Sequence, residues 1–185
     1  MSEIRKINTE ELKNIAGEFK AGDKILLSGL VYTSRDAAHK RIKALIDSNQ
    51  KLPYDLENAV IYYAGPTPAP QGRPIGSCGP TTSGRMDKFA PEFLDLGLAA
   101  MIGKGERSQE VRDAIVRNKA LYLCAVGGAG ALAGKCIKSC EVIAFEDLGC
   151  ESVKKLYIED FPLIVADDIY GGDIFSEGRK KYCTL

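Results

Sequence analysis

Histidine, paired cysteines and long apolar runs are scarce or missing in this chain. His39 is its only histidine, which excludes zinc sites built from several histidines and leaves at most one histidine-based acid–base system. The six cysteines include no C-x-x-C pair, so the ligand spacing of a closed metal site is missing, and we expect this chain to bind no metal itself. Most of the cysteines are expected to be reduced, buried and apolar in character.

The chain also lacks net charge and any segment long enough to span a membrane. Its 25 Lys and Arg residues balance 25 Asp and Glu residues, so no excess of positive charge predicts binding to nucleic acid or to an anionic membrane. No apolar run reaches the roughly 18 residues of a spanning helix, and the start of the chain has no signal-peptide core. We therefore expect a cytoplasmic protein without nucleic-acid or membrane partners, folded as a single domain over residues 1–185.

Helix and strand patterns alternate along most of the sequence. They predict an N-terminal helix over 8–19 capped at Asn8 and a second helix over 34–48 capped at Ser34. Further helices are expected over 92–97, 108–118, just after Gly130, and 176–181, with strands over 24–31, 60–64, 98–102, 120–126, 141–145, 156–159 and 163–166. Residues 176–181 are expected as a solvated helix, with a tail that docks on a partner as the alternative. This alternation predicts a three-layer α/β domain with a largely parallel sheet.

A long proline-rich segment interrupts the alternation. Five of the eight prolines lie between Pro66 and Pro80, together with three glycines, so the segment is expected to form one stiff loop. Loops of more than about 12 residues without secondary structure are uncommon in compact domains and are often functional. The shape of this loop therefore predicts a site in or beside it.

Three polar clusters follow predicted strands or end the stiff loop, at Thr33–His39, Gly79–Asp87 and Ile102–Gly105. Each places a cation beside small or hydroxyl residues, a combination that suits the binding of anions. Strand ends are where ligand sites gather in α/β proteins, so together the clusters predict a pocket for a carboxylate.

Each of these residues also has a structural alternative. Arg35 and Asp36 could form a surface ion pair, since most charged side chains are exposed. Thr81 and Thr82 could cap a helix, and Lys104 could be a solvated lysine in a turn.

Seven stretches, in order along nearly the whole chain, resemble the β subunits of class I (iron–sulfur) fumarate hydratases and of tartrate dehydratases. They are Gly29–His39, Leu52–Leu56, Tyr62–Pro66, Gly79–Asp87, Ile102–Gly105, Gly127–Ala131 and Phe161–Ile164. The resemblance implies a three-layer swivelling β/β/α fold and a hydro-lyase that adds water reversibly to fumarate to give malate. The stretches at residues 62–63, 83–85 and 127–130 are more similar to fumarase than to tartrate dehydratase.

The same resemblance implies a cofactor and a partner. The family's 4Fe-4S cluster has one iron without a cysteine ligand, which acts as a Lewis acid on the substrate hydroxyl. Its cysteine ligands belong to the α subunit, so we expect this chain to bind no metal and to be active only with an α subunit. A small dicarboxylate is the expected substrate, and homodimerisation of the αβ unit is left open.

Roles for individual residues also follow from the resemblance. Arg35, Arg85 and Lys104 are implied as binders of the substrate carboxylates. Thr81 and Thr82 are implied as catalytic residues beside the reacting carbon, with Thr81 as the candidate base and Thr82 as the alternative. Removing a proton next to a carboxylate spreads negative charge onto that group, which fixed cations stabilise in the transition state. The residues expected to support this set are Asp36, His39 and Asp87.

Other functions stay open at this point. Gly128–Ala133 satisfies the G-x-G-x-x-A pattern of dinucleotide binding, but it lies late in the chain and only a short helix follows it. We therefore expect these glycines to allow a close approach of backbone instead. The remaining alternatives are the β subunit of a tartrate dehydratase and a non-catalytic module that binds dicarboxylates or serves in assembly.

Overall fold

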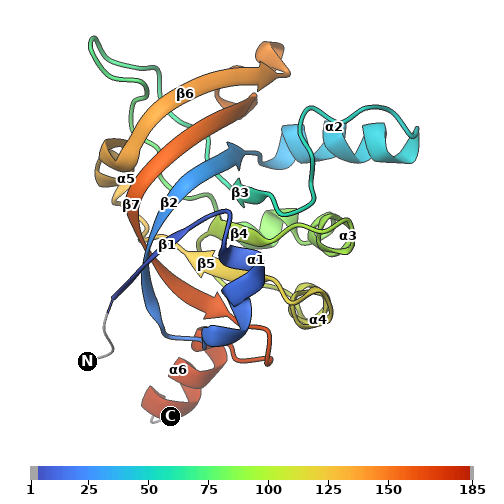
Figure 1. Cartoon of the computed structure of the whole chain (residues 1–185), viewed down its shortest axis with the longest axis vertical. Coiled ribbons are helices and arrows are strands. Elements are labelled where there is room, and N and C mark those ends of the chain that lie inside the picture. Colours follow the sequence, from blue (N-terminus) through green and yellow to red (C-terminus); the bar gives the residue numbers. More distant parts are fainter. Residues whose placement is uncertain (1–3, 184–185) are drawn as a thin grey trace.

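The strands of this protein close into a barrel, with helices packed on its outside (Figure 1). The computed structural model describes residues 4–183. The elements are β1 (Arg5–Asn8), α1 (Leu12–Ile15), β2 (Lys24–Thr33), α2 (Asp36–Asp47), β3 (Val60–Tyr62), α3 (Ala90–Asp95), β4 (Ala100–Gly103), α4 (Gln109–Asn118), β5 (Leu121–Cys124), α5 (Gly130–Cys136), β6 (Ile137–Ala144), β7 (Val153–Asp167) and α6 (Ile174–Tyr182). Short 3-10 turns η1, η2 and η3 span Ala16–Glu18, Ser83–Met86 and Glu146–Glu151. Among the described residues, none of the helices is both long and apolar enough to span a membrane.

The sheet is mixed, and its last long strand closes it. Strands β1 to β5 pair in parallel in the order β1-β2-β3-β4-β5. Strand β7 runs antiparallel to both β5 and β2, so β2, β3, β4, β5 and β7 form a closed five-stranded ring. Strand β6 extends the sheet along the first half of β7. The expected α/β class is therefore confirmed, whereas the expected largely parallel sheet is corrected to a mixed one.

Two apolar clusters occupy the two faces of this sheet. Val60 and Tyr62 of β3 belong to the cluster that fills the barrel, while Ile61 and Tyr63 belong to the cluster beneath α2, α3 and α4. These three helices lie together on one side of the strands (Figure 1). Successive side chains of a strand point to opposite faces, so a strand covered on both faces must be apolar at every position. That requirement explains the uninterrupted apolar runs that predicted β3, β4 and β5.

The closing strand β7 joins two strands that the sequence pattern separates. Strands were expected over 156–159 and 163–166, but β7 runs unbroken through Asp160 and Pro162. Asp160 adopts a positive φ of 49°, and the pairing with β2 shifts register between Leu27 and Gly29. Pro162 lies between the end of the β6 pairing and the start of the β5 pairing, where its missing N–H disturbs least. Because of this irregularity, the sequence pattern predicts two short strands where the structure has a single long one.

Neither of the two predicted helix caps forms as expected. Asn8 Oδ1 accepts a hydrogen bond from the Glu10 N–H (3.1 Å), and Glu11 Oε2 accepts one from the Asn8 N–H (3.3 Å), but α1 begins only at Leu12, and Glu11 before it makes no side-chain cap hydrogen bond. The helix itself is only α1 followed by a 3-10 turn, and β1 before it was not predicted. The Ser34 cap is wrong: α2 has no side-chain cap hydrogen bond.

One buried carboxyl at the end of β7 has no hydrogen-bond partner among residues 4–183. Asp167 is 2% exposed, and neither of its side-chain oxygens is bonded within that range. Burial raises the pKa of Asp167 to about 7, with Asp173 adding to the shift and Arg107 and Arg112 opposing it. At pH values between its ordinary pKa and about 7, Asp167 therefore keeps its proton in the folded state and loses it in the unfolded state. Asp167 thus lowers the stability of the fold as the pH rises through that window.

We expect Asp167→Asn, which resembles the protonated acid, to gain stability relative to the parent protein between pH 5 and pH 8. The gain should be about 1–3 kcal/mol, because each unit of pKa shift corresponds to about 1.4 kcal/mol. Urea unfolding at the two pH values measures it. The exposed Asp113→Asn serves as the control and should show no such change. An equal difference from the parent at both pH values would show that Asp167 is not protonated in the fold.

Candidate functional site

The candidate site lies at the edge of the barrel where the parallel strands β2, β3 and β4 end. Arg35 comes shortly after β2, Ala64 after β3 and Lys104 directly after β4. The proline-rich loop returns to this edge, because Pro80 pairs with Ala64 and Thr82 pairs with Lys104 through isolated β-bridges. Carboxyl ends of neighbouring parallel strands lie at one edge of a sheet. The three polar clusters of the sequence are therefore brought together.

Backbone hydrogen bonds fix Thr81 between the ends of β3 and β4. Its N–H donates to the Tyr63 carbonyl (2.6 Å), and its carbonyl accepts from the Lys104 N–H (3.3 Å). Thr81 is 9% exposed, whereas Thr82 is exposed. Thr82 precedes the 3-10 turn η2 but makes no side-chain cap hydrogen bond to it. The alternative of a threonine cap is therefore wrong, and Thr81 is held with little freedom.

Arg35 is packed against Gly65 and held by an acidic side chain. Its Nη2 lies 3.0 Å from Glu151 Oε1. A Cβ on Gly65 would lie 2.6 Å from Arg35 Cζ, so any larger residue at this position would displace the guanidinium. Arg35 Nε is buried and has no partner within residues 4–183. One donor of the guanidinium is thus available to a further acceptor.

Arg85 forms a two-point ion pair with Asp36. Nε lies 3.0 Å from Oδ1 and Nη2 lies 2.6 Å from Oδ2, a geometry that joins η2 to the first turn of α2. The Arg85 side chain stays 53% exposed. Because Asp36 pairs with Arg85 and Arg35 pairs with Glu151, the alternative of an Arg35–Asp36 surface pair is wrong.

A glycine after β5, Gly130, allows a close approach of backbone, as the sequence predicts. A Cβ on Gly127, by contrast, would lie 3.6 Å from Cδ of the partly buried Lys104, which is an ordinary contact. Gly130, which opens α5, accepts a hydrogen bond from the Cys78 N–H (2.9 Å), and a Cβ on it would lie 3.0 Å from the nitrogen of Gly79. The start of this short helix is thus packed against the proline-rich loop.

Asp87 holds a different arginine from the one expected. Its Oδ1 accepts a hydrogen bond from Arg107 Nε (2.7 Å), and its Oδ2 accepts one from the Ser108 N–H (2.7 Å). The expectation that Asp87 supports a carboxylate-binding arginine is therefore corrected: the Arg85 partner is Asp36. The prediction relied on closeness in sequence: Asp87 is only two residues from Arg85, but its side chain faces the loop before α4.

The side chains described here do not suit an iron–sulfur cluster. Over residues 4–183, no three His, Cys, Asp or Glu side chains are placed to hold a metal ion. Of the six cysteines, Cys78 is buried, Cys150 and Cys183 are exposed, and the other three are half-buried.

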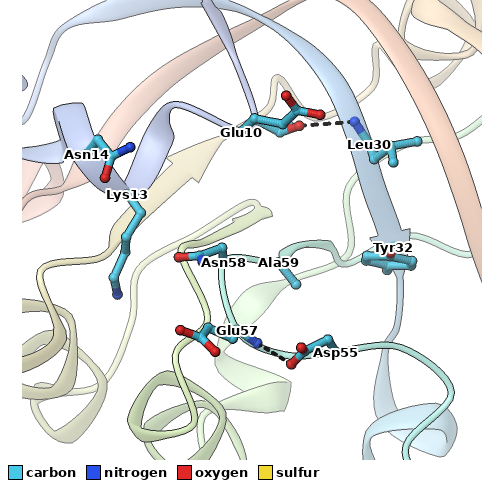
Figure 2. A pocket seen from close by; sticks show the side chains of 10 residues that line it. Glu10, Lys13, Asn14, Leu30, Tyr32, Asp55, Glu57, Asn58 and Ala59 are labelled. Atoms are coloured by element: carbon cyan, nitrogen blue, oxygen red, sulfur yellow. Dashed lines mark hydrogen bonds between the residues drawn. The ribbon is translucent and has the colours of Figure 1, made fainter.

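A cavity of about 400 Å³ lies elsewhere, between α1, β2 and residues 55–59 (Figure 2). Two of its polar side chains are already hydrogen-bonded: Lys13 Nζ donates to the Asn118 carbonyl (2.8 Å), and Asp55 Oδ1 accepts from the Glu57 N–H (2.9 Å). None of the residues predicted for the site lines it. The cavity is therefore a separate feature of the surface.

Comparison with known proteins shows the family of this chain. Residues 2–178 match the model of the family described as Fumarase C-terminus. This chain belongs to the fumarase C-terminus family. It is 40% identical over 90% of its length to the anaerobic class I fumarate hydratase of Escherichia coli K12, and 36% identical over 91% to fumarate hydratase 2 of Leishmania major. It spans only 31% and 30% of those proteins.

A second kind of relative has nearly the length of this chain. The L(+)-tartrate dehydratase subunit beta of Escherichia coli K12 is 33% identical over 95% of this chain and 87% of its own length. The relatives of this chain thus include proteins named as fumarate hydratases, of which it spans about a third, and a protein named as a β subunit, of which it spans most.

Sequence reasoning missed three residues that touch the site of this fumarase C-terminus chain: Glu151, Tyr63 and Arg107. Glu151 lies at the end of η3, far along the chain from Arg35, so no local pattern could pair the two. The sequence places Tyr63 in a strand and in a stretch that resembles fumarase but indicates no role for it, although its carbonyl accepts a hydrogen bond from Thr81. Arg107 follows Lys104 by three positions in the same strand-end loop, and this was the one available signal.

His39 is a neutral packing residue and not an exposed proton carrier. It is fully buried, and its ring stacks on Phe93 with centroids 5.0 Å apart. Its Nδ1 lies 2.7 Å from Ser34 Oγ and 3.3 Å from the Arg35 carbonyl. Burial lowers the pKa of His39 from 6.5 to about 3. His39 therefore supports the backbone of Arg35 as a neutral ring.

The single histidine makes this easy to test by NMR on untagged protein. Because the pKa of His39 lies far below the ordinary value, its ring carbon and proton shifts should stay constant from pH 8 to pH 5. Urea-unfolded protein is the control and should titrate near 6.5. A midpoint between pH 6 and 7 in the folded protein would contradict the buried, neutral ring.

Proposed function

We propose that this chain is the β subunit of a class I, iron–sulfur hydro-lyase that interconverts fumarate and malate together with an α subunit. The observation that carries the proposal is the meeting of Arg35, Thr81 and Lys104 at one edge of the barrel. The likeness to fumarate hydratases, and to a β subunit of nearly the same length, supports it. The three-layer swivelling β/β/α arrangement and a single domain are part of the same proposal.

The proposal divides the work between two subunits. This chain supplies cations and a hydroxyl group, whereas its described side chains offer no group that suits a cluster. We therefore assign the 4Fe-4S cluster and the departure of the substrate hydroxyl to the α subunit. The residues of this chain bind the carboxylates and move the proton at the neighbouring carbon.

Thr81 is the proposed base. In the direction from malate to fumarate, its oxygen takes the proton from the carbon next to a carboxylate, and in hydration it returns that proton. Negative charge then spreads onto the carboxylate, where the cations of Arg35, Arg85 and Lys104 stabilise it. Arginine suits this task because its fork contacts both carboxylate oxygens.

A threonine hydroxyl needs help to act as a base, because its alkoxide is disfavoured in water. A cation 4 Å away, at an effective dielectric constant of about 20, stabilises the alkoxide by about 4 kcal/mol, or roughly three pKa units. The cluster of cations thus makes a small alkoxide population accessible. The burial of Thr81, with its backbone fixed at both sides, keeps its oxygen in place.

Tartrate dehydratase is the second candidate, because a tartrate dehydratase β subunit resembles this chain over nearly its whole length. The stretches at residues 62–63, 83–85 and 127–130 favour fumarate. A non-catalytic module that binds dicarboxylates is the third.

Anaerobic reconstitution with a candidate α subunit separates these functions. We expect the chain alone to be colourless and inactive, and the complex to hydrate fumarate faster than it dehydrates L-tartrate. Absorbance at 240 nm follows fumarate, and iron and sulfide analysis follows the cluster. Stoichiometric iron on the isolated chain would overturn the division of labour. A complex active only on tartrate would select the second candidate.

The role of Thr81 is tested by comparing Thr81→Val with Thr82→Val in that complex. If Thr81 is the base, its replacement should lower kcat by about a hundredfold or more, while the affinity for malate changes little. Steady-state rates, malate affinity and Tm are measured for both variants. Thr82→Val is the matched control, since Thr82 is exposed. If Thr81→Val keeps a third of kcat, or if only Thr82→Val loses turnover, Thr81 is not the base.

A further inference from the structure

A buried cation that plays no part in the proposed chemistry lies next to the candidate site. The Arg107 side chain is 0% exposed and pairs with Asp87. Its Cζ lies 5.3 Å from the ring centroid of Tyr63 and 4.9 Å from that of Tyr122, so two aromatic rings flank the guanidinium. A buried ion pair is weak as a source of stability, but it restricts the arrangement of the groups around it.

Both tyrosines beside Arg107 are bonded to the segment that carries the site. Tyr63 accepts the Thr81 N–H through its carbonyl (2.6 Å). Tyr122 Oη lies 2.8 Å from Ser83 Oγ and 2.6 Å from the Gly105 carbonyl oxygen. Its one hydroxyl proton can go to that carbonyl, while Ser83 donates to Tyr122 Oη. The hydroxyl of Tyr122 thus joins the turn after Lys104 to the residues after Thr81.

The packing in this region leaves no room for adjustment. A Cβ on Gly103 would overlap Ser83 Oγ and would lie 3.0 Å from Tyr63 Cδ2. The Ser83 N–H also donates to the Lys104 carbonyl (2.9 Å). Residues 81–83 are therefore pressed onto the end of β4, with Arg107 and its two tyrosines on the buried side.

We propose that Arg107, acting through Tyr63 and Tyr122, is a positioning residue that holds the Thr81–Ser83 segment in register with Lys104. It touches no substrate. This inference rests on the proposed function in one respect: the proposed function gives Thr81 and Lys104 their roles in the reaction. Displacing reacting groups by about 1 Å can lower a rate by about a hundredfold, so such a residue affects turnover without a contact to the reacting atoms.

The variants are chosen to change this arrangement without unfolding the chain. Tyr122→Phe removes one hydroxyl and keeps the ring beside Arg107, and Arg107→Lys keeps the charge beside Asp87 but loses the planar fork. Tyr54→Phe is the matched control. Its hydroxyl is buried with no hydrogen-bond partner in residues 4–183, so its loss breaks no bond in that range.

Amide hydrogen exchange on the isolated chain reports positioning without any need for activity. In Tyr122→Phe and Arg107→Lys, the amides of Thr81, Ser83 and Lys104 should exchange about five- to tenfold faster, while those of β2 keep their rates. In the reconstituted complex, kcat should fall about tenfold or more, with Tm and the affinity for malate little changed. Tyr54→Phe should match the parent protein in each measurement.

The outcomes separate this inference from the proposed function. Unchanged exchange at residues 81–83 and 104 in both variants would overturn the positioning role, as would equally faster exchange throughout the chain. A parent complex without hydro-lyase activity would overturn the proposed function. The change in amide hydrogen exchange at residues 81–83 and 104 would then still show whether Arg107 positions that segment.

Discussion

The antiparallel ladder between β2 and β7 is the contact on which the remaining arrangement depends. It extends from Lys24 opposite Ile164 to Tyr32 opposite Lys155, and β7 pairs with β5 on its other side. Closing a sheet fixes the tilt and stagger of its strands and removes open edges from the ring. The ends of β2, β3 and β4 are thereby held as a rim, and the polar side chains on that rim take fixed positions.

The two arginines on this rim are each held by an acid from another part of the chain. Glu151 from η3 holds Arg35, and Asp36 from α2 holds Arg85. These two pairs are partly exposed, so water screens them and a further anion can compete for the arginines. The Arg107–Asp87 pair is shielded from water. If Arg107 bound another anion instead, Asp87 would be left unpaired in a largely buried position. Exposure thus separates arginines suited to binding from one suited to holding the segment.

The proposed base depends on charges that the fold must hold in place. A single hydroxyl gains basicity only from several fixed charges nearby. A scaffold that is already rigid before a ligand binds can hold such charges in place. The closed barrel provides this scaffold with strands buried on both faces.

The sequence by itself determined the α/β class, most of the helices and strands, and the three segments that form the site. Local periodicity and the order of motifs encode these features, and the match to the fumarase C-terminus family agrees with them. Only the tertiary structure decided that β7 is one strand, that Asp87 pairs with Arg107, and that Glu151 lies against Arg35. These facts depend on the closure of the sheet, which brings distant residues together through contacts that no local pattern records.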